Sequence, residues 1–136
     1  GLTFVNGAIT GRPTLPGDFA FIITLSDTEA RTTTYAGELT VAPRLRIPTQ
    51  RLKPGKVGKR FRVTLKSLGG AGEAQWRLKR GPLPKGILFD RTTGTFLGVP
   101  AKPGRWRVQV EIRDELGVKT SATVVLVVKP SLLRRK

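Results

Sequence analysis

The residue types that carry most enzyme chemistry are scarce in this chain of 136 residues, which has no histidine or cysteine, one tyrosine and nine acidic residues. Histidine and cysteine are the usual ligands of zinc and copper, and histidine is the usual base that activates a serine or threonine nucleophile. We therefore expect no catalytic residue, no metal site and no cofactor site. The chain is predicted not to be an enzyme.

Two short motifs could still suggest chemistry. Asp114 and Glu115 are adjacent in a predicted turn, where neighbouring side chains diverge instead of facing each other as the two carboxylates of a glycosidase do. The glycine-rich stretch 69–72 lies between two predicted strands and lacks the following Lys-Ser/Thr pair and helix of a phosphate-binding loop. We interpret the first motif as a structural turn and the second as a flexible hairpin loop.

Charge is distributed unevenly along the chain, whose formal net charge is +16. Residues 1–43 contain two arginines and four acids, whereas residues 44–136 contain the other 23 Lys and Arg and five acids. Such asymmetry is typical of a segment that meets a polyanion, but a high charge also keeps a β-rich protein soluble. Both interpretations stay open. The candidate polyanion-binding residues are the basic side chains on the polar faces of predicted strands, namely Arg60, Arg62, Lys66, Arg77, Lys79, Arg105, Arg107 and Arg113.

The elements that carry these side chains show the alternation of β-strands, with apolar and polar residues in turn. The pattern predicts strands within residues 59–67, 74–80, 94–100, 104–114 and 119–129, and a proline-interrupted edge strand at residues 43–50. Trp76 and Trp106 fall on the inward phase of their strands, which favours a place in the core over a role in stacking. No segment has a helical period or the length of a membrane span. The chain is predicted to be all-β.

An internal repeat relates the two ends of the chain. Shifting the sequence by 87 residues superposes residues 7–41 on residues 94–128 without a gap, and nine of the 35 pairs are identical. The identical pairs are Gly7/Gly94, Gly11/Gly98, Pro13/Pro100, Pro16/Pro103, Gly17/Gly104, Asp27/Asp114, Thr33/Thr120, Leu39/Leu126 and Val41/Val128. A period of this size suits a small β-sandwich arranged in tandem.

The first copy of the repeat lacks counterparts of residues 44–82. We therefore expect residues 1–43 to be the C-terminal half of a first module, residues 44–129 to be a complete sandwich, and residues 130–136 to be a basic tail. The apolar face of the half module would lack an opposing sheet. Either the missing strands lie upstream in a longer parent chain, or a protein partner or strand exchange within a homo-oligomer supplies them.

Residues 83–128 combine a Leu-Pro-x-Gly opening, an Asp-x-x-Thr-Gly turn, a Gly-x-Pro exit and an Asp-x-x-Gly turn between two long strands. This pattern resembles the putative Ig repeat of bacterial surface proteins, a dystroglycan-type cadherin-like module. Its positions here are Leu83, Pro84, Gly86, Asp90, Thr93, Gly94, Gly98, Pro100, Gly104, Val110, Asp114 and Gly117. Residues 1–41 resemble a second, degenerate copy. The resemblance implies an Ig-like or cadherin-like antiparallel β-sandwich in an extracellular or cell-surface protein.

Two functions are compatible with these features. The first is a non-catalytic extracellular module that acts as a spacer, adhesion or assembly unit of a larger surface, virion or appendage protein, with neighbouring repeats or another protein as partner. The alternative is a polyanion-binding module that docks residues 44–129 on nucleic acid or an acidic glycan. The family is usually neutral or acidic, so the basic second module is a departure. The calcium sites of true cadherins are not carried over, because residues 40–48 contain no acid.

Overall fold

The computed structural model describes residues 1–132, and strands are the regular elements that it contains there. The chain divides into two compact units, Gly1–Arg44 and Leu45–Lys136, which we call the N-terminal and C-terminal units. The predicted all-β fold is confirmed. Residues 133–136 of the predicted basic tail lie outside the described residues. Among residues 1–132, no helix has the length and apolarity needed to cross a bilayer.

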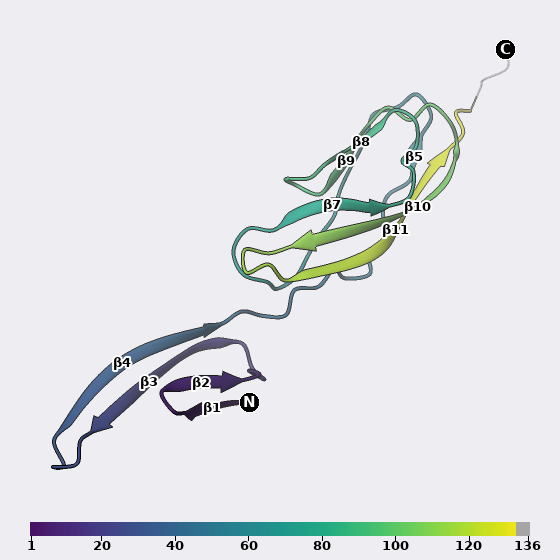
Figure 1. The fold of residues 1–136 in the computed structure, drawn as a ribbon. Helices are drawn as coiled ribbons and strands as arrows, with labels where there is room; N and C mark the ends of the chain where they lie inside the picture. Colours follow the sequence, from purple (N-terminus) through teal and green to yellow (C-terminus); the bar gives the residue numbers. More distant parts are fainter. Residues whose placement is uncertain (133–136) are drawn as a thin grey trace. The chain divides into compact units, whose positions relative to one another are not determined.

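The C-terminal unit is a sandwich of two sheets (Figure 1). One sheet has the strand order β5 (Gly55–Lys56), β11 (Lys119–Lys129), β10 (Gly104–Arg113) and β7 (Gln75–Arg80). The other has the order β6 (Phe61–Thr64), β9 (Thr95–Gly98) and β8 (Ile87–Asp90). Neighbouring strands are antiparallel, except for the short parallel pair of β11 with β5.

The core of this unit lies between the two sheets and follows the predicted alternation. Phe96 from one sheet and Val108, Val110 and Ile112 from the other are completely buried. Trp76 is buried among them, and Trp106 is half-buried and packs against the same cluster. Both tryptophans therefore serve the core, as predicted.

The opening of the C-terminal unit differs from the expectation. Residues 43–50 form no strand, and the main chain there makes a single bridge, from Arg46 to Leu68. The edge position beside β11 is occupied by β5 instead. Proline lacks the N–H group that a ladder needs; Pro43 and Pro48 interrupt this stretch, and Pro54 follows it. The edge strand therefore begins only after the last of these prolines.

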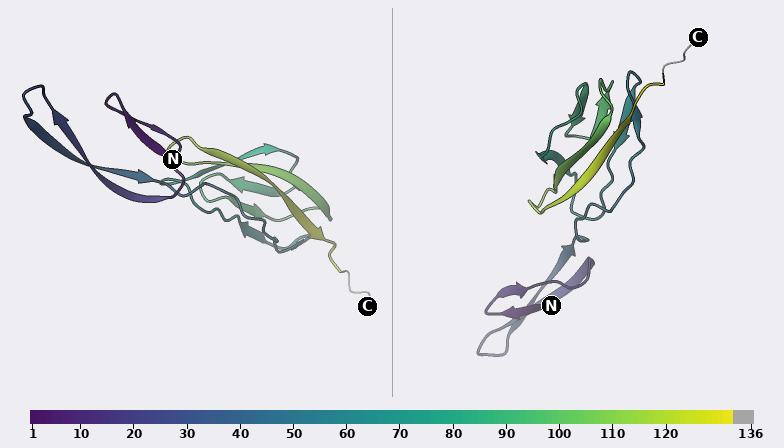
Figure 2. Two further views of the ribbon diagram at one scale, coloured as in Figure 1. Left: turned by 90° about the horizontal axis from the view of Figure 1, so that it is seen from below. Right: turned by 90° about the vertical axis from the view of Figure 1, so that its right-hand side faces the viewer.

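The N-terminal unit consists of two separate hairpins. β1 (Leu2–Val5) pairs with β2 (Ala8–Gly11), and β3 (Gly17–Ser26) pairs with β4 (Thr32–Val41). The first hairpin closes through a two-residue Asn6–Gly7 turn with φ values of 50° and 76°, the left-handed pair that a type I′ turn requires. Figure 2 shows the long β3–β4 ribbon without a third strand paired along either edge.

The internal repeat is also a structural repeat. The β3–β4 hairpin runs in register from Gly17↔Val41 to Ser26↔Thr32, and the β10–β11 hairpin runs from Gly104↔Val128 to Arg113↔Lys119. Each pair in the second hairpin is displaced by 87 residues from its counterpart in the first. The two hairpins are therefore copies of one framework, with the same length and the same register.

Candidate functional site

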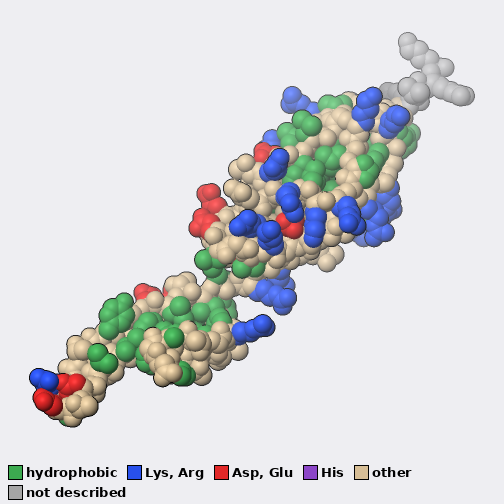
Figure 3. Space-filling model, in the orientation of Figure 1, with side chains coloured by type: hydrophobic (Ala, Val, Ile, Leu, Met, Phe, Trp, Pro, Cys, Tyr) green, Lys and Arg blue, Asp and Glu red, His purple; other side chains and the backbone are tan. Residues whose placement is uncertain are grey.

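Five of the eight predicted basic residues lie together on one sheet. Alternation along β7 and β10 places them on the face turned away from the core, because Trp76, Val108 and Val110 occupy the inner face. These residues are Arg77 and Lys79 on β7 and Arg105, Arg107 and Arg113 on β10. We call this surface the basic face. Lys and Arg side chains are numerous over the C-terminal unit in Figure 3.

One acidic residue lies within the basic face. Glu111 is directly opposite Arg77 in the β10–β7 register, and its side chain is only 12% exposed. Arg77 Nη2 donates a 3.0 Å hydrogen bond to Glu111 Oε1, and Lys79 Nζ lies 3.8 Å from Oε2. Two cations therefore compensate this carboxylate. Among the described residues, Arg105, Arg107 and Arg113 make no ion pair, so their charge remains available to an anionic ligand.

A groove of about 670 Å³ lies at the β7 edge of this face. Four cations line it, from β7, β10, β11 and the loop after β8, with Glu73 and Glu111 as the acids. The four are Arg77, Arg91, Arg113 and Lys119. The excess of positive charge suits a carboxylate, sulfate or phosphate group of a polymer, bound through charge-assisted hydrogen bonds.

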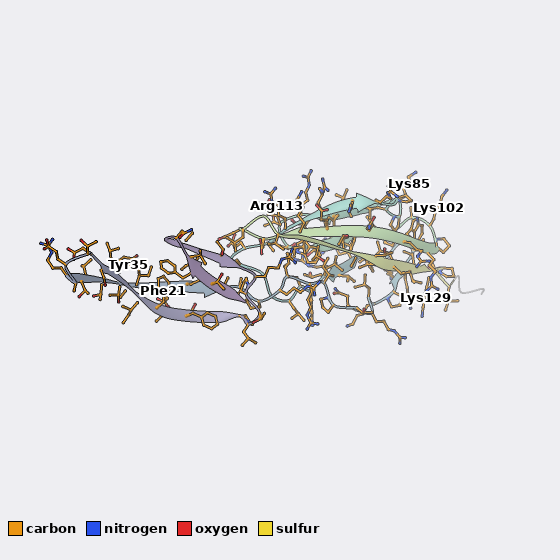
Figure 4. The ribbon with its side chains drawn as sticks, turned by 60° about the horizontal axis from the view of Figure 1, so that its bottom comes forward. Phe21, Tyr35, Lys85, Lys102, Arg113 and Lys129 are labelled. Carbon is orange, nitrogen blue, oxygen red and sulfur yellow. The ribbon has the colours of Figure 1, made fainter. Side chains whose placement is uncertain are left out.

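The other three predicted residues lie in or beside β6 of the second sheet. Arg62 lies in β6, with Arg60 immediately before the strand and Lys66 two residues after it. Arg60, Arg62 and Lys66 therefore do not share the surface of the first five. Figure 4 shows further lysines, Lys85, Lys102 and Lys129, at the end of the unit opposite Arg113. Whether any of these residues binds a polyanion stays a prediction.

Two residues of the groove were missed from the sequence. Lys119 is the register partner of Arg113 across the β10–β11 hairpin, and the tight Asp114–Gly117 turn was a signal that could have placed them opposite each other. Arg91 has no comparable signal. It reaches the groove because its carbonyl accepts a 2.9 Å hydrogen bond from the amide of Trp76, a contact between segments distant in sequence.

The second candidate surface is apolar and lies in the N-terminal unit. Phe19, Phe21, Ile23 and Leu25 occupy the positions of Trp106, Val108, Val110 and Ile112 in the repeat. Leu25 is 68% exposed, whereas Ile112 is completely buried, and Ile9 is 43% exposed where its counterpart Phe96 is completely buried. We call this surface the open face. Phe21 and Ile23 are half-buried, so residues that are buried in one unit are exposed or half-buried in the other.

The open face is hollowed between the two hairpins of its unit. A groove of about 670 Å³ is lined by apolar side chains of all four strands and of the loop between β2 and β3. Among them are Phe4, Ile9, Leu15, Phe19, Phe21 and Leu39. A contiguous exposed apolar surface of this kind marks a binding site on a soluble protein.

Part of the open face is covered from within. The ring of Phe21 lies over Gly37, where a β-carbon would be 2.5 Å from Phe21 Cζ and 3.1 Å from Tyr35 Cε1 (Figure 4). The counterparts of Phe21 and Gly37 are Val108 and Val124. The N-terminal unit thus has a phenylalanine opposite a glycine where the C-terminal unit has two valines opposite each other. This exchange keeps the hairpin packed locally without a second layer.

The turns that join the paired long strands are chemically equivalent. Asp27 Oδ1 accepts 2.9 Å hydrogen bonds from the amides of Glu29 and Arg31, and Asp114 Oδ1 accepts bonds of 3.0 and 2.9 Å from Leu116 and Val118. The hydrogen bond from the Arg31 amide holds the pKa of Asp27 below its ordinary value, aided by the Arg31 guanidinium and the Glu29 amide and opposed by slight desolvation. Both aspartates therefore stabilise their turns, and for Asp114 this agrees with the structural turn expected from the sequence.

Within the described part of the chain, no group of three or more acidic side chains is placed to hold a metal ion. The two candidate surfaces can attract an anion or bury apolar side chains. Neither contains a nucleophile next to a base.

Comparisons with known proteins agree with this architecture. The sequence profile of the family described as "Putative Ig domain" matches residues 45–129. No curated protein sequence matches the chain.

Several solved structures share the fold. Two are putative alpha-galactosidases from Bacteroides fragilis NCTC 9343, each with a TM-score of 0.54 over 62% of this chain, at 22% and 19% identity. A third is the fragment of protocadherin gamma B2 with extracellular cadherin domains 3–6, with a TM-score of 0.51 over 84% of this chain, at 14% identity. The chain spans only 17% of each galactosidase and 34% of the protocadherin fragment.

Identities this low establish the fold alone, which is the Ig-like and cadherin-like sandwich that the sequence predicts. The profile match covers more than half of the chain and the complete sandwich. The chain belongs to the putative Ig domain family.

Proposed function

We propose that this chain is a non-catalytic module of a larger extracellular protein, in which it acts as a structural spacer, adhesion or assembly unit. Domains of this type are typically extracellular and generally non-catalytic. The observation that carries the proposal is the repetition of one hairpin framework, β3–β4 and β10–β11, with the same register and the same turn. Repeating a module extends a protein and multiplies its surface, which is what a stalk or adhesin needs.

The location can be tested on intact cells that display the parent protein. A protease added outside the cells is expected to release peptides from residues 45–129 before lysis, while a cytosolic protein stays intact. Release of these peptides only after lysis would contradict an extracellular role.

A replacement experiment separates a spacer from an adhesion unit. Residues 45–129 of the parent are exchanged for an unrelated Ig-like module of similar length, and attachment of the cells is measured. A spacer tolerates the exchange because only its length and stiffness matter, whereas an adhesion unit loses attachment. Retained attachment after complete deletion of the segment would contradict both roles.

A second candidate function is docking of the basic face on a polyanion, either nucleic acid or an acidic glycan. The observation that favours it is the grouping of Arg105, Arg107 and Arg113 on one face, where none of them pairs with an acid of residues 1–132. Such a surface binds phosphate or sulfate polymers with a strong dependence on salt.

Matched charge reversals test this candidate. One variant carries Arg105→Glu, Arg107→Glu and Arg113→Glu on the basic face, and the control carries Arg60→Glu, Arg62→Glu and Lys66→Glu near the other sheet. Both change the net charge equally. We expect only the first to lose retention on heparin or DNA at about 0.15 M salt. Equal losses would show that net charge alone causes retention, and no retention of the unmodified chain would remove the candidate.

A further inference from the structure

The open face of the N-terminal unit has a matching template in the C-terminal unit. There, the equivalent strands β8 to β11 are covered by the segment that contains β5, β6 and β7. We call this segment, residues 45–82, the front half. It contributes Leu45, Phe61, Leu65 and Trp76 to the buried core, with exposures of 4–7%. The repeat therefore specifies which kind of structure fits the open face.

Two unpaired strand edges in the N-terminal unit show where such a segment would bind. In the C-terminal unit β6 pairs with β9 and β7 pairs with β10. The counterparts of those two acceptor strands are β2 and β3, and each has an edge that no strand of the described part of the chain pairs with. Unpaired backbone groups at a sheet edge are a template for a further strand.

The space beside Gly7 is open where a front-half side chain lies in the C-terminal unit. In the C-terminal unit a β-carbon on Gly94 would lie 2.6 Å from Trp76 Nε1, whereas a β-carbon on Gly7 would meet no atom within 4 Å. The two-residue turn at Asn6–Gly7 also lacks counterparts of Arg91 and Thr92, which opens this position further. No atom of the described residues therefore occupies, beside Gly7, the position that Trp76 occupies beside Gly94.

We propose that the open face is covered by the front half of a like module, with strands that correspond to β5, β6 and β7, carried in the same polypeptide. The donor would pair one strand with Ala8–Gly11 and another with the outer edge of β3 around residues 22–26. It would place aromatic and aliphatic side chains against Phe19, Phe21 and Leu25. This inference concerns the completion of the N-terminal unit and does not depend on where the protein works.

A second copy of the chain is a poor donor. If the front half of one chain covered the N-terminal unit of another, the C-terminal unit that released it would lose four buried core residues. Such an exchange would cover the apolar face of one N-terminal unit and expose the core of one C-terminal unit, so the total exposed apolar surface would not fall. A front half joined covalently avoids this loss and the entropic cost of association. In the C-terminal unit the connection is short, because only residues 81–86 separate β7 from β8.

The test extends the full chain by a copy of residues 45–85 placed directly before Gly1, since Gly86 is the counterpart of Gly1 in the repeat. Hydrogen exchange is measured for the amides of Ala8–Gly11 and of residues 22–26. We expect these amides to exchange about 100-fold more slowly than in the original chain, because pairing and burial convert a freely opening edge into core. Amides of Val108–Ile112 serve as the internal control and should not change.

Two matched variants keep the result decisive. The extension with Trp76→Ala in the added copy should lose most of the new protection, and an extension of the same composition in scrambled order should give none. The extended chain should also bind less of an apolar dye than the original chain. Unchanged exchange at Ala8–Gly11 with protected Val108–Ile112 would overturn the proposal, and so would equal protection by the scrambled extension.

Discussion

The indole of Trp76 lies directly against Gly94, so that a β-carbon on the glycine would be 2.6 Å from Trp76 Nε1. This contact joins the front half of the C-terminal unit to the Asp-x-x-Thr-Gly turn. The residue that corresponds to Gly94 in the N-terminal unit is Gly7, whose β-carbon direction is empty. The two glycines therefore differ in the way expected if the N-terminal unit lacks the front half proposed above.

Substitution of the two glycines should therefore have unequal costs. Both have positive φ, 70° at Gly94 and 76° at Gly7, which costs an alanine about 1 kcal/mol. Gly94→Ala must also displace Trp76, so we expect a total loss of about 2–4 kcal/mol in the free energy of unfolding. Gly7→Ala should lower the free energy of unfolding only by the backbone term of about 1 kcal/mol.

The measurement is denaturant unfolding followed by tryptophan fluorescence for the C-terminal unit and by hydrogen exchange for the N-terminal unit. In a Trp76→Leu background the cost of Gly94→Ala should fall toward that of Gly7→Ala. Equal costs of the two substitutions in the unmodified chain would refute the role of the Trp76 contact.

A second prediction concerns the turns of the two long hairpins. Ala30 has a φ of 63° and stands where the repeat has Gly117, with a φ of 83°. Ala30→Gly removes left-handed strain but adds freedom to the unfolded chain, so we expect a net stabilisation of roughly 0.5–1 kcal/mol. Gly117→Ala is the inverse change and should destabilise its hairpin by a similar amount, since the nearest atom to the added carbon is 3.6 Å away. Thermal unfolding of both variants tests this pair, and a loss of stability in Ala30→Gly would be the contrary result.

A third prediction concerns pH. The pKa of Asp27 is lowered in the folded chain, so its contribution to stability is present above its ordinary value of 3.8 and is lost as the pH falls through the folded value. The amide resonances of Glu29 and Arg31, both bonded to Asp27 Oδ1, should titrate with a midpoint below 3.8. Asp27→Asn should abolish this titration. A midpoint above 3.8 would contradict the hydrogen-bonding account of the turn.

A fourth prediction uses the one carboxylate on the basic face. Glu111→Gln removes the partner of Arg77 and Lys79, which should weaken the C-terminal unit by about 1 kcal/mol. The same change makes the face more positive, and affinity for heparin should rise by a factor of about 2–5 at low salt. Isothermal titration calorimetry with heparin measures the affinity of the unmodified chain and of the variant. Unchanged or weaker binding would argue against this face as the docking surface.

Local patterns predicted much of the fold. Alternation placed Val108, Val110 and Ile112 inward and Arg105 and Arg107 outward, and both phases are seen in the structure. Side chains alternate between the two faces of a strand every two residues, so a short stretch of sequence is enough to show which residues point inward.

Features that depend on distant segments were not predicted. The edge strand forms at Gly55–Lys56 because Pro43, Pro48 and Pro54 prevent pairing earlier in the chain and because β11 offers an edge there. The approach of Arg91 to Trp76, through the hydrogen bond from the Trp76 amide to the Arg91 carbonyl, requires the loop after β8 to pack beside β7. No single strand contains this information.

The most direct test of the account is hydrogen exchange of the unmodified chain at a concentration where it is monomeric. It compares Phe21–Leu25 in β3 with the repeat counterparts Val108–Ile112 in β10. An open N-terminal face predicts that the amides of Phe21–Leu25 exchange at least about 100-fold faster, because no second layer covers them. Equal protection of the two segments would contradict the claim that the N-terminal unit is the uncovered half of the same sandwich.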